Sequence, residues 1–197
     1  QRPKSAVGFA LVGPFYRANA PKRKRGESTA LGNTKGDRVR ITGKVYDLSS
    51  KKTIGGAMLD VWQAATNGLY ENQDEKQPDY NLRGRFQADE DGTFDLVALL
   101  PTPYPVPTDG PVGQLMKLAR RQPNRPAHIH FIVSAPDYET LVTQVFKKGD
   151  GTIDVDPVFT ADDNLTGDFR KEDGEWRLRY DFQLKPGDST MPKPPIP

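Results

Sequence analysis

Apolar and polar residues alternate with a period of two along much of this chain, which favours a fold built from β-strands. In the clearest example, apolar residues occupy every second position: Trp176, Leu178, Tyr180, Phe182 and Leu184. Side chains that alternate in this way lie on opposite faces of a strand, one toward a core and the other toward solvent. We interpret residues 176–184 as the strand that closes a β-sandwich.

The remaining strand patterns agree with this fold class. They are expected at residues 38–46, 57–64, 82–88, 93–99, 124–133 and 141–147. Residues 82–88 and 93–99 flank Asp89-Glu90-Asp91-Gly92, whose Asp-Gly pair predicts a β-hairpin. The segments 124–133 and 141–147 are expected to form the next pair. Only residues 112–121 have helix character, so we predict an all-β sandwich of mostly antiparallel strands with long active-site loops and one short helix.

Chain length and turn content favour one domain. The 197 residues include 18 glycines and 18 prolines, well above the usual share of about 12%, as expected for short strands joined by many turns. We expect an N-terminal arm (1–37) packed on the core, a sandwich that carries the site (38–184) and a proline-rich tail or linker (185–197). The first residue is not methionine, which suggests that an upstream segment was removed.

Charge excludes two classes of partner. The chain has 28 basic and 26 acidic residues, a net charge of +2, which gives no strong field for nucleic acid or membrane. No segment approaches the roughly 18 apolar residues that a membrane span needs. The basic run at residues 22–25 is interpreted as a solvated loop.

The only two histidines, His128 and His130, are spaced i and i+2 on an expected strand, so both imidazoles point to one side. A shared metal ion would explain this spacing, although two half-buried histidines bonded to backbone carbonyls need no metal. The absence of cysteine excludes Cys/His zinc patterns. A site of two histidines and one carboxylate stays open, but Asp47, Asp60 and Asp79 are dispersed and expected to be solvated.

Two tyrosines lie in rigid contexts. Tyr70 ends the run 61–70, and Tyr104 lies between prolines in Leu100-Pro101-Thr102-Pro103-Tyr104-Pro105-Val106-Pro107. Prolines on both sides fix the backbone and restrict the directions open to the phenol. Stiff loops often carry functional side chains, although such a loop is more often a pocket wall. Trp62 is expected to pack in the core.

Taken together, these segments resemble the intradiol ring-cleavage dioxygenases. The likeness lies in residues 43–47, 56–64, 68–70, 100–111 and 125–130, and extends over about residues 10 to 165. The 23 residues between Tyr104 and His128 resemble the catechol, chlorocatechol and hydroxyquinol branch. Relatives in that branch carry an N-terminal helical dimer domain for which this chain has no room, so a monomer or weak oligomer is expected.

The resemblance implies a non-haem iron(III) site with four protein ligands: Tyr70, Tyr104, His128 and His130. It implies that Tyr104 is the axial phenolate that the substrate displaces, with His130 opposite, and that Tyr70 and His128 are equatorial. Arg125 matches the family arginine that stabilises negative charge on the ring. Gln144 matches a family glutamine near the iron-bound hydroxide, where chlorocatechol enzymes often have histidine.

The same resemblance implies cleavage of a catechol-type aromatic diol with O2 to a cis,cis-muconate. A stretch that includes Tyr16 resembles one that lines the family's substrate pocket, so Gly13 and Pro14 are candidate binding residues alongside Val106 and Pro107. The ring substituents that are accepted stay open. Location also stays open for this soluble chain, with a slight preference for export over the cytoplasm.

Two other readings of the pattern remain. A metal-free β-sandwich of transthyretin-like or carbohydrate-binding type would explain the strands but makes no use of the histidines and Tyr104. A zinc or carboxylate-iron site for hydrolysis or another oxygenation would use the histidines and leave Tyr104 merely nearby.

Overall fold

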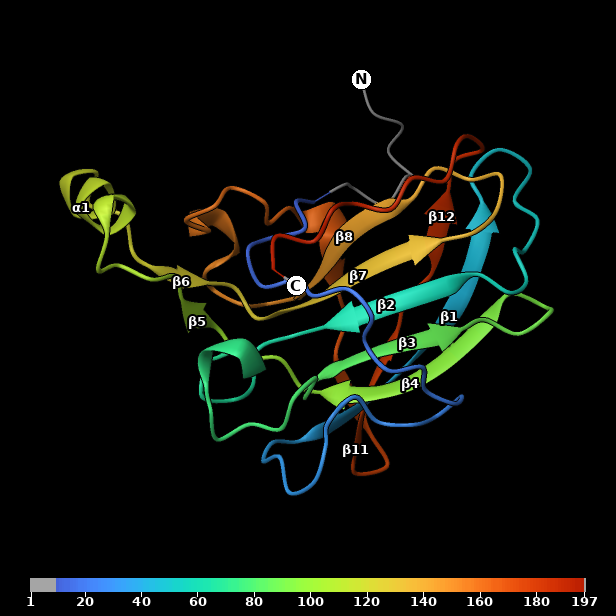
Figure 1. Cartoon of the computed structure of the whole chain (residues 1–197), viewed down its shortest axis with the longest axis horizontal. Coiled ribbons are helices and arrows are strands. Elements are labelled where there is room, and N and C mark those ends of the chain that lie inside the picture. The colour runs from blue at the N-terminus through green and yellow to red at the C-terminus, as the bar shows by residue number, and fades with distance from the viewer. Residues whose placement is uncertain (1–9, 197) are drawn as a thin grey trace.

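Two five-stranded sheets pack face to face in the computed structural model, which describes residues 10–196 (Figure 1). The first sheet has the order β10-β11-β1-β12, with β4 also paired to β1; its strands are β1 (Arg38–Asp47), β4 (Thr93–Leu99), β10 (Arg170–Glu172), β11 (Glu175–Arg179) and β12 (Phe182–Leu184). The second has the order β3-β2-β7-β8-β9; its strands are β2 (Met58–Trp62), β3 (Arg83–Gln87), β7 (His128–Ser134), β8 (Leu141–Lys147) and β9 (Thr166–Gly167). The β-sandwich expected from the sequence is confirmed.

The remaining elements are short and lie in the loops. A two-stranded ladder joins β5 (Tyr104–Pro105) to β6 (Asn124–Arg125), and the helix α1 (Pro111–Leu118) lies between them in the chain. These three elements extend from one end of the sandwich, away from the strands of the two large sheets (Figure 1). Three 3-10 turns complete the set: η1 (Glu71–Gln73), η2 (Ile153–Val155) and η3 (Asp163–Leu165).

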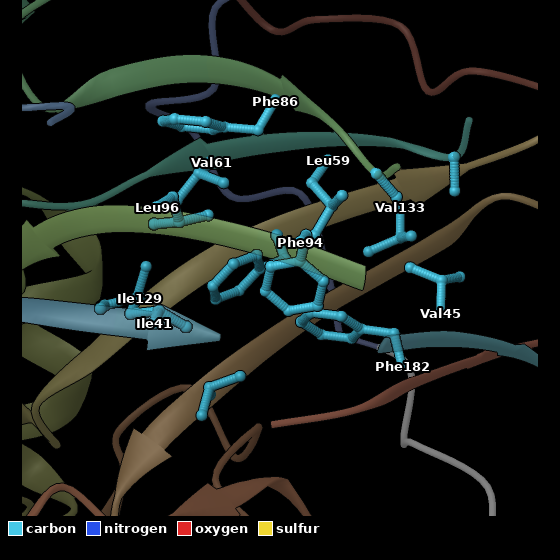
Figure 2. Close-up of a cluster of buried hydrophobic side chains, with 14 of the residues drawn as sticks. Ile41, Val45, Leu59, Val61, Phe86, Phe94, Leu96, Ile129, Val133 and Phe182 are labelled. Carbon is cyan, nitrogen blue, oxygen red and sulfur yellow. The ribbon is translucent and has the colours of Figure 1, made fainter. Parts of the chain in front are cut away.

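The apolar core lies between the two sheets. Figure 2 shows side chains from both layers meeting around Phe94: Ile41, Val45, Leu96 and Phe182 from the first sheet, and Leu59, Val61, Phe86, Ile129 and Val133 from the second. All nine, and Phe94 itself, are almost fully buried. Burial of this much apolar surface is the main term that favours the folded chain.

The second sheet is buried on both faces. Leu59 and Val61 of β2 point into the core, whereas Trp62 of the same strand belongs to a separate buried cluster. On β7, Ile129 and Phe131 point into the core and Ile132 into that separate cluster. The period of two therefore supplies one apolar face and a second face on which the residues of the candidate site lie.

The predicted hairpin at residues 89–92 is wrong in its pairing. The turn itself forms, because Gly92 has φ 77° and the Asp89 amide donates to the Thr93 carbonyl at 2.8 Å. However, β3 pairs with β2, and β4 pairs with β1 in the other sheet. Local residues fix the reversal of the chain, but burial decides which strand each arm pairs with, and here the turn crosses from one sheet to the other.

The segment 176–184 forms two strands instead of one. Both β11 and β12 pair parallel to β1 in the same register, with an interruption at Tyr180 and Asp181. At the interruption the Tyr180 amide donates to Thr42, and the Asp181 side chain accepts from the Lys44 amide. Gly43 is required opposite this point, because a Cβ there would collide with the Tyr180 carbonyl.

The segment 124–133 is also divided. Residues Asn124–Arg125 pair with Tyr104–Pro105, and the strand resumes at His128 after Pro126 and Ala127. Proline removes a ladder donor, which explains the gap. The expected pairing of this strand with residues 141–147 is confirmed, from His128↔Phe146 to Val133↔Leu141.

The N-terminal and C-terminal segments run over the outside of the sandwich. Isolated bridges join Lys22 to Arg85 and Ser28 to Val97, and a further bridge joins Arg17 to Ile196. Residues 1–9 of the expected arm, and Pro197 of the expected tail, lie outside the described residues. Among the described residues, no helix has the length and apolar character needed to cross a bilayer.

Candidate functional site

Four side chains that are far apart in the sequence bring their polar atoms together on the outer side of the second sheet. The Tyr70 hydroxyl lies 2.9 Å from the Tyr104 hydroxyl and 3.1 Å from His130 Nε2. His128 Nε2 lies 3.4 Å from the Tyr104 hydroxyl and 3.2 Å from His130 Nε2. All four residues are buried, so two phenols and two imidazoles face one small volume.

Both imidazoles are held neutral. Burial, followed by the charge of Arg125, lowers the pKa of His128 to about 3. Burial, followed by the charge of His128, lowers the pKa of His130 well below its ordinary value. His128 Nδ1 lies 2.6 Å from the Pro126 carbonyl, which accepts its proton, so Nε2 presents a lone pair to the cluster. Neutral imidazoles are the form that binds metal.

The ring of His130 is oriented by stacking. It lies against Trp62 with centroids 4.6 Å apart and an interplanar angle of 10°. Its Nδ1 is buried and has no hydrogen-bond partner among the described residues. Trp62 is buried as expected for a core residue, but its neighbour is the site and not the sandwich interior.

Tyr70 is positioned by a braced loop at the start of η1. Its backbone amide donates to the Gln73 side-chain oxygen at 3.0 Å. The next residue, Glu71, is buried and forms ion pairs with Arg83 at 2.7 Å and Arg17 at 2.8 Å. A charge pair of this kind is costly to break from one side, so it fixes the loop.

Gly68 allows the Tyr70 and Tyr104 loops to approach. Its φ is 82°, and a Cβ at this position would lie 3.1 Å from the Cβ of Tyr104. Tyr104 in turn is held by its backbone, which pairs with Arg125 in the β5–β6 ladder. The loops that carry the two phenols are therefore packed on each other and on the arginine.

Arg125 is buried beside the cluster and makes several polar contacts. Its guanidinium lies 3.0 Å from His128 Nε2 and donates to Gln144 Oε1 at 2.7 Å. It also donates to Thr160 at 2.6 Å and pairs with Asp156 at 3.2 Å. Burial lowers the pKa of Arg125, but its interactions with Tyr104 and Asp156 outweigh this and raise the pKa above its ordinary value. A permanent cation is thus fixed at the edge of the site.

A cavity of about 390 Å³ opens onto this cluster. Its lining includes Tyr70, Tyr104, His130, Arg125 and Gln144. It also includes all four residues named as binding candidates, namely Gly13, Pro14, Val106 and Pro107. Gln144 further donates from Nε2 to the Leu11 carbonyl at 3.4 Å, which ties the N-terminal arm to the cavity wall.

The donor set fits a metal ion. Two atoms bonded to one metal ion at about 2.0–2.2 Å lie roughly 3 Å from each other. The phenol oxygens and imidazole Nε2 atoms of the cluster are separated by 2.9–3.4 Å, which matches this geometry. Burial raises the pKa of Tyr70 well above its ordinary value, so the phenol needs a cation to become a phenolate. Hard anionic oxygens with imidazoles suit iron(III).

Carboxylates are not part of this cluster. Within residues 10–196, no group of three or more His, Cys, Asp or Glu side chains could hold a metal ion. The present cluster contains only two such residues, because its other two donors are tyrosines. The carboxylate-iron alternative therefore has no third ligand in the described part of the chain. Asp47 and Asp79 lie elsewhere, bonded to Tyr138 and Arg17 respectively. Asp79 is exposed as expected, whereas Asp47 is buried, so the expectation of a solvated side chain is wrong for Asp47.

Asp60 was expected to be solvated, and this expectation is wrong. It is buried on β2 and accepts from the Tyr16 hydroxyl at 3.1 Å, and burial raises its pKa to about 6. Tyr16 in turn packs on Trp62 with centroids 4.8 Å apart. The pair forms a polar layer behind the stacked rings of Trp62 and His130.

Sequence reasoning missed three residues of the site. Asp156 and Thr160 hold Arg125, and Phe15 stacks on Tyr70 with centroids 4.7 Å apart. Asp156 is 31 residues from Arg125 in the sequence, and Phe15 is further still from Tyr70. No local spacing rule reports such contacts, although an aspartate before Pro157 in an otherwise featureless loop was a weak signal of a fixed turn.

Comparison with known proteins gives consistent matches. A family model described as "Dioxygenase" matches residues 11–186. The chain is 40% identical over 180 residues to the intradiol ring-cleavage dioxygenase prcA of Aspergillus niger, covering 91% of this chain and 57% of the relative. It is 39% identical to the hydroxyquinol 1,2-dioxygenase of a Rhizobium species, covering 93% and 66%.

A solved structure agrees with the fold over the same region. The hydroxyquinol 1,2-dioxygenase from Pseudomonas putida DLL-E4 superposes with a TM-score of 0.87 at 37% identity, covering 93% of this chain and 68% of that one. The chain thus spans about three fifths to two thirds of the length of these relatives, and the matched part includes both sheets and the four-residue cluster.

Proposed function

Because this chain belongs to the intradiol ring-cleavage dioxygenase family, we propose that it cleaves a catechol-type aromatic diol with O2 to a cis,cis-muconate as a non-haem iron(III) enzyme. The observation that carries the proposal is the convergence of two phenols and two imidazoles beside a cavity. A transthyretin-like or carbohydrate-binding module has no use for this buried set of donors.

Four residues would hold the iron: Tyr70, Tyr104, His128 and His130. The chemistry that iron(III) supplies when bound is activation of a chelated diol toward dioxygen. With iron(III) bound, two phenolates and two neutral imidazoles would leave one net positive charge at the site, so the residues would favour the deprotonated form of a diol over the neutral form. The buried, neutral histidines require no proton loss before they bind.

Tyr104 would act as the proton acceptor for the incoming diol. Its hydroxyl faces both Tyr70 and His128, and its ring also forms part of the cavity wall. As a phenolate, with one side on the other ligands and the other on the substrate, Tyr104 could accept a proton from a diol hydroxyl and become a neutral phenol without a change of fold. The proline-flanked β5 ladder with Arg125 keeps its oxygen in reach.

Arg125 would stabilise negative charge that develops on the substrate ring. The guanidinium lines the cavity and is held by Asp156, Gln144 and Thr160, so little reorganisation is needed when charge appears. Gln144 would share this role by orienting the guanidinium and by presenting its amide to the cavity. The apolar wall, including Pro14 and Val106, would exclude water from the ring.

The test is an assay of the iron-loaded protein with catechol, followed by oxygen uptake and by the absorbance of muconate. We expect stoichiometric consumption of oxygen and formation of a cis,cis-muconate. Resorcinol is the matched control, because its meta hydroxyls cannot chelate one ion, and it should give neither signal. Iron-loaded protein that leaves catechol, hydroxyquinol and protocatechuate all unchanged would contradict the proposal.

A further inference from the structure

The cavity beside the cluster is larger than a single benzenediol ring requires. At about 390 Å³ it falls in the range of roughly 300–1,000 Å³ that holds drug-sized ligands. The diol hydroxyls must lie at the buried end, against Tyr70, Tyr104 and His130, because the ligand atoms are there. The rest of the cavity is therefore available to whatever the ring carries on its opposite side.

The wall beyond the ligands offers few free polar groups. Its polar side chains are Trp62, which stacks on His130 beside the ligands, and Arg125, Gln144 and Thr160, of which the guanidinium donates to the other two. The remaining wall is apolar, with Val12 and Phe15 from the arm and Val106 from the proline-rich loop. A carboxylate or further hydroxyl placed against this apolar part of the wall would lose water without gaining a partner.

The apolar wall continues outward to the protein surface. Three lining residues are also exposed, Leu11 by 75%, Val112 by 61% and Val158 by 42%. They come from three separate elements, namely the arm, α1 and the loop after η2. Further apolar side chains lie close to them in the sequence, with Leu115 exposed by 65% and Phe159 by 76%.

On the basis of the proposed function, we infer that the preferred substrates are catechols that carry an extended apolar substituent, alkyl or aryl, opposite the diol. The substituent fills the outer part of the cavity and covers Leu11, Val112 and Val158 at its mouth. Exposed apolar patches that adjoin a cavity mark binding surfaces, and continuity with the ligand cluster identifies the occupant as part of the substrate.

The test is a series from 4-methylcatechol to 4-hexylcatechol, in which the electronic effect of the alkyl group stays nearly constant. Burial of each added methylene should raise kcat/KM by about threefold to fourfold until the chain leaves the protein. Protocatechuate, with a carboxylate at the same position, should be the poorest member. A flat or falling series with active enzyme overturns the inference and leaves the proposed function intact.

Two variants on α1 test where the substituent contacts the protein. Val112→Gln should reduce the ratio of kcat/KM for hexyl over methyl substrate by about tenfold. Leu118→Gln is the matched control, because Leu118 is 81% exposed on the same helix and does not line the cavity, and it should leave the ratio unchanged. Equal effects of the two changes would contradict a substrate contact at the mouth.

A binding measurement tests this inference independently of turnover. Calorimetric titration with 4-alkylphenols, which have one hydroxyl and cannot be cleaved, should show affinity that rises with chain length even if no diol is turned over. Affinity independent of chain length overturns the inference in either case. A stable dimer whose formation is lost in Leu118→Gln, together with a flat series, would assign the apolar rim to a second copy of the chain instead.

Discussion

The two faces of the strands β2 and β7 are both buried, yet one face carries apolar side chains and the other carries mainly polar and aromatic ones. One face places Leu59, Ile129 and Phe131 in the sandwich core, against aliphatic and aromatic side chains of the other sheet. The other face places Asp60 and Trp62 of β2, and both histidines of β7, under the arm and the long loops.

The difference lies in how each face is satisfied. The core face needs only close packing of apolar groups, and any residue of similar shape would serve. The site face contains polar groups that must find partners, and they find them in residues contributed by remote loops, such as Tyr70, Tyr104 and Asp156. Changes on the first face should therefore affect stability, and changes on the second should affect chemistry or, for a buried acid, the pH dependence of stability.

The largest expected effect is on the core face. Phe131→Ala should lower the free energy of unfolding by about 3–5 kcal/mol, because the ring is fully buried and leaves a cavity. Denaturant unfolding measures this directly. Iron content below the unfolding transition should match that of the wild type, and a folded variant that has lost its iron would show that the two faces are not independent.

On the site face, Arg125→Leu should keep the iron but slow turnover by about 10²–10³, the usual cost of removing one prearranged electrostatic donor. Steady-state oxygen uptake and metal analysis check the two halves of this prediction. Arg125→Lys should recover part of the rate, since it keeps the charge without the fork that binds Asp156 and Gln144. Full activity in the leucine variant would remove Arg125 from its assigned role.

The smallest effect concerns Asp60, a buried acid behind the site. Its pKa of about 6 is above that of the unfolded chain, so folding becomes less favourable as the pH rises from about 4 to 6, by at most about 1.4 kcal/mol per unit. Asp60→Asn should remove this cost, and its stability relative to wild type should be higher at pH 7.5 than at pH 4.5. Asp79→Asn, at an exposed carboxylate, is the control. No pH dependence of the difference would mean that burial does not govern Asp60.

Much of the core face could be predicted from the sequence. The alternation at residues 38–46 and 93–99 gave strands close to β1 and β4, because it depends on the period of two alone. The pairing at residues 89–92 could not be predicted, since a turn specifies reversal and not the partner. The interruption at Tyr180 depends on a close approach to Gly43 from the other end of the chain.

The residues of the site that lie in recognisable sequence motifs were predictable. The spacing of His128 and His130, with the contexts of Tyr70 and Tyr104, identified four residues that converge in space. The contacts that orient them were not predictable, because the proline after Asp156 signals at most a turn and does not identify Arg125 as the partner of the carboxylate. Asp60 was misjudged for the same reason, since its burial results from the arm that covers β2.

The most direct test of the account is titration of the metal-free protein with iron(III), followed by visible absorption and metal analysis, for the wild type, Tyr70→Phe and the control Tyr180→Phe. We expect one iron per chain and a strong phenolate-to-iron band in the wild type and in Tyr180→Phe, with both iron content and band reduced in Tyr70→Phe. Unchanged iron content and absorption in Tyr70→Phe would contradict the proposed binding of one ion by the four side chains.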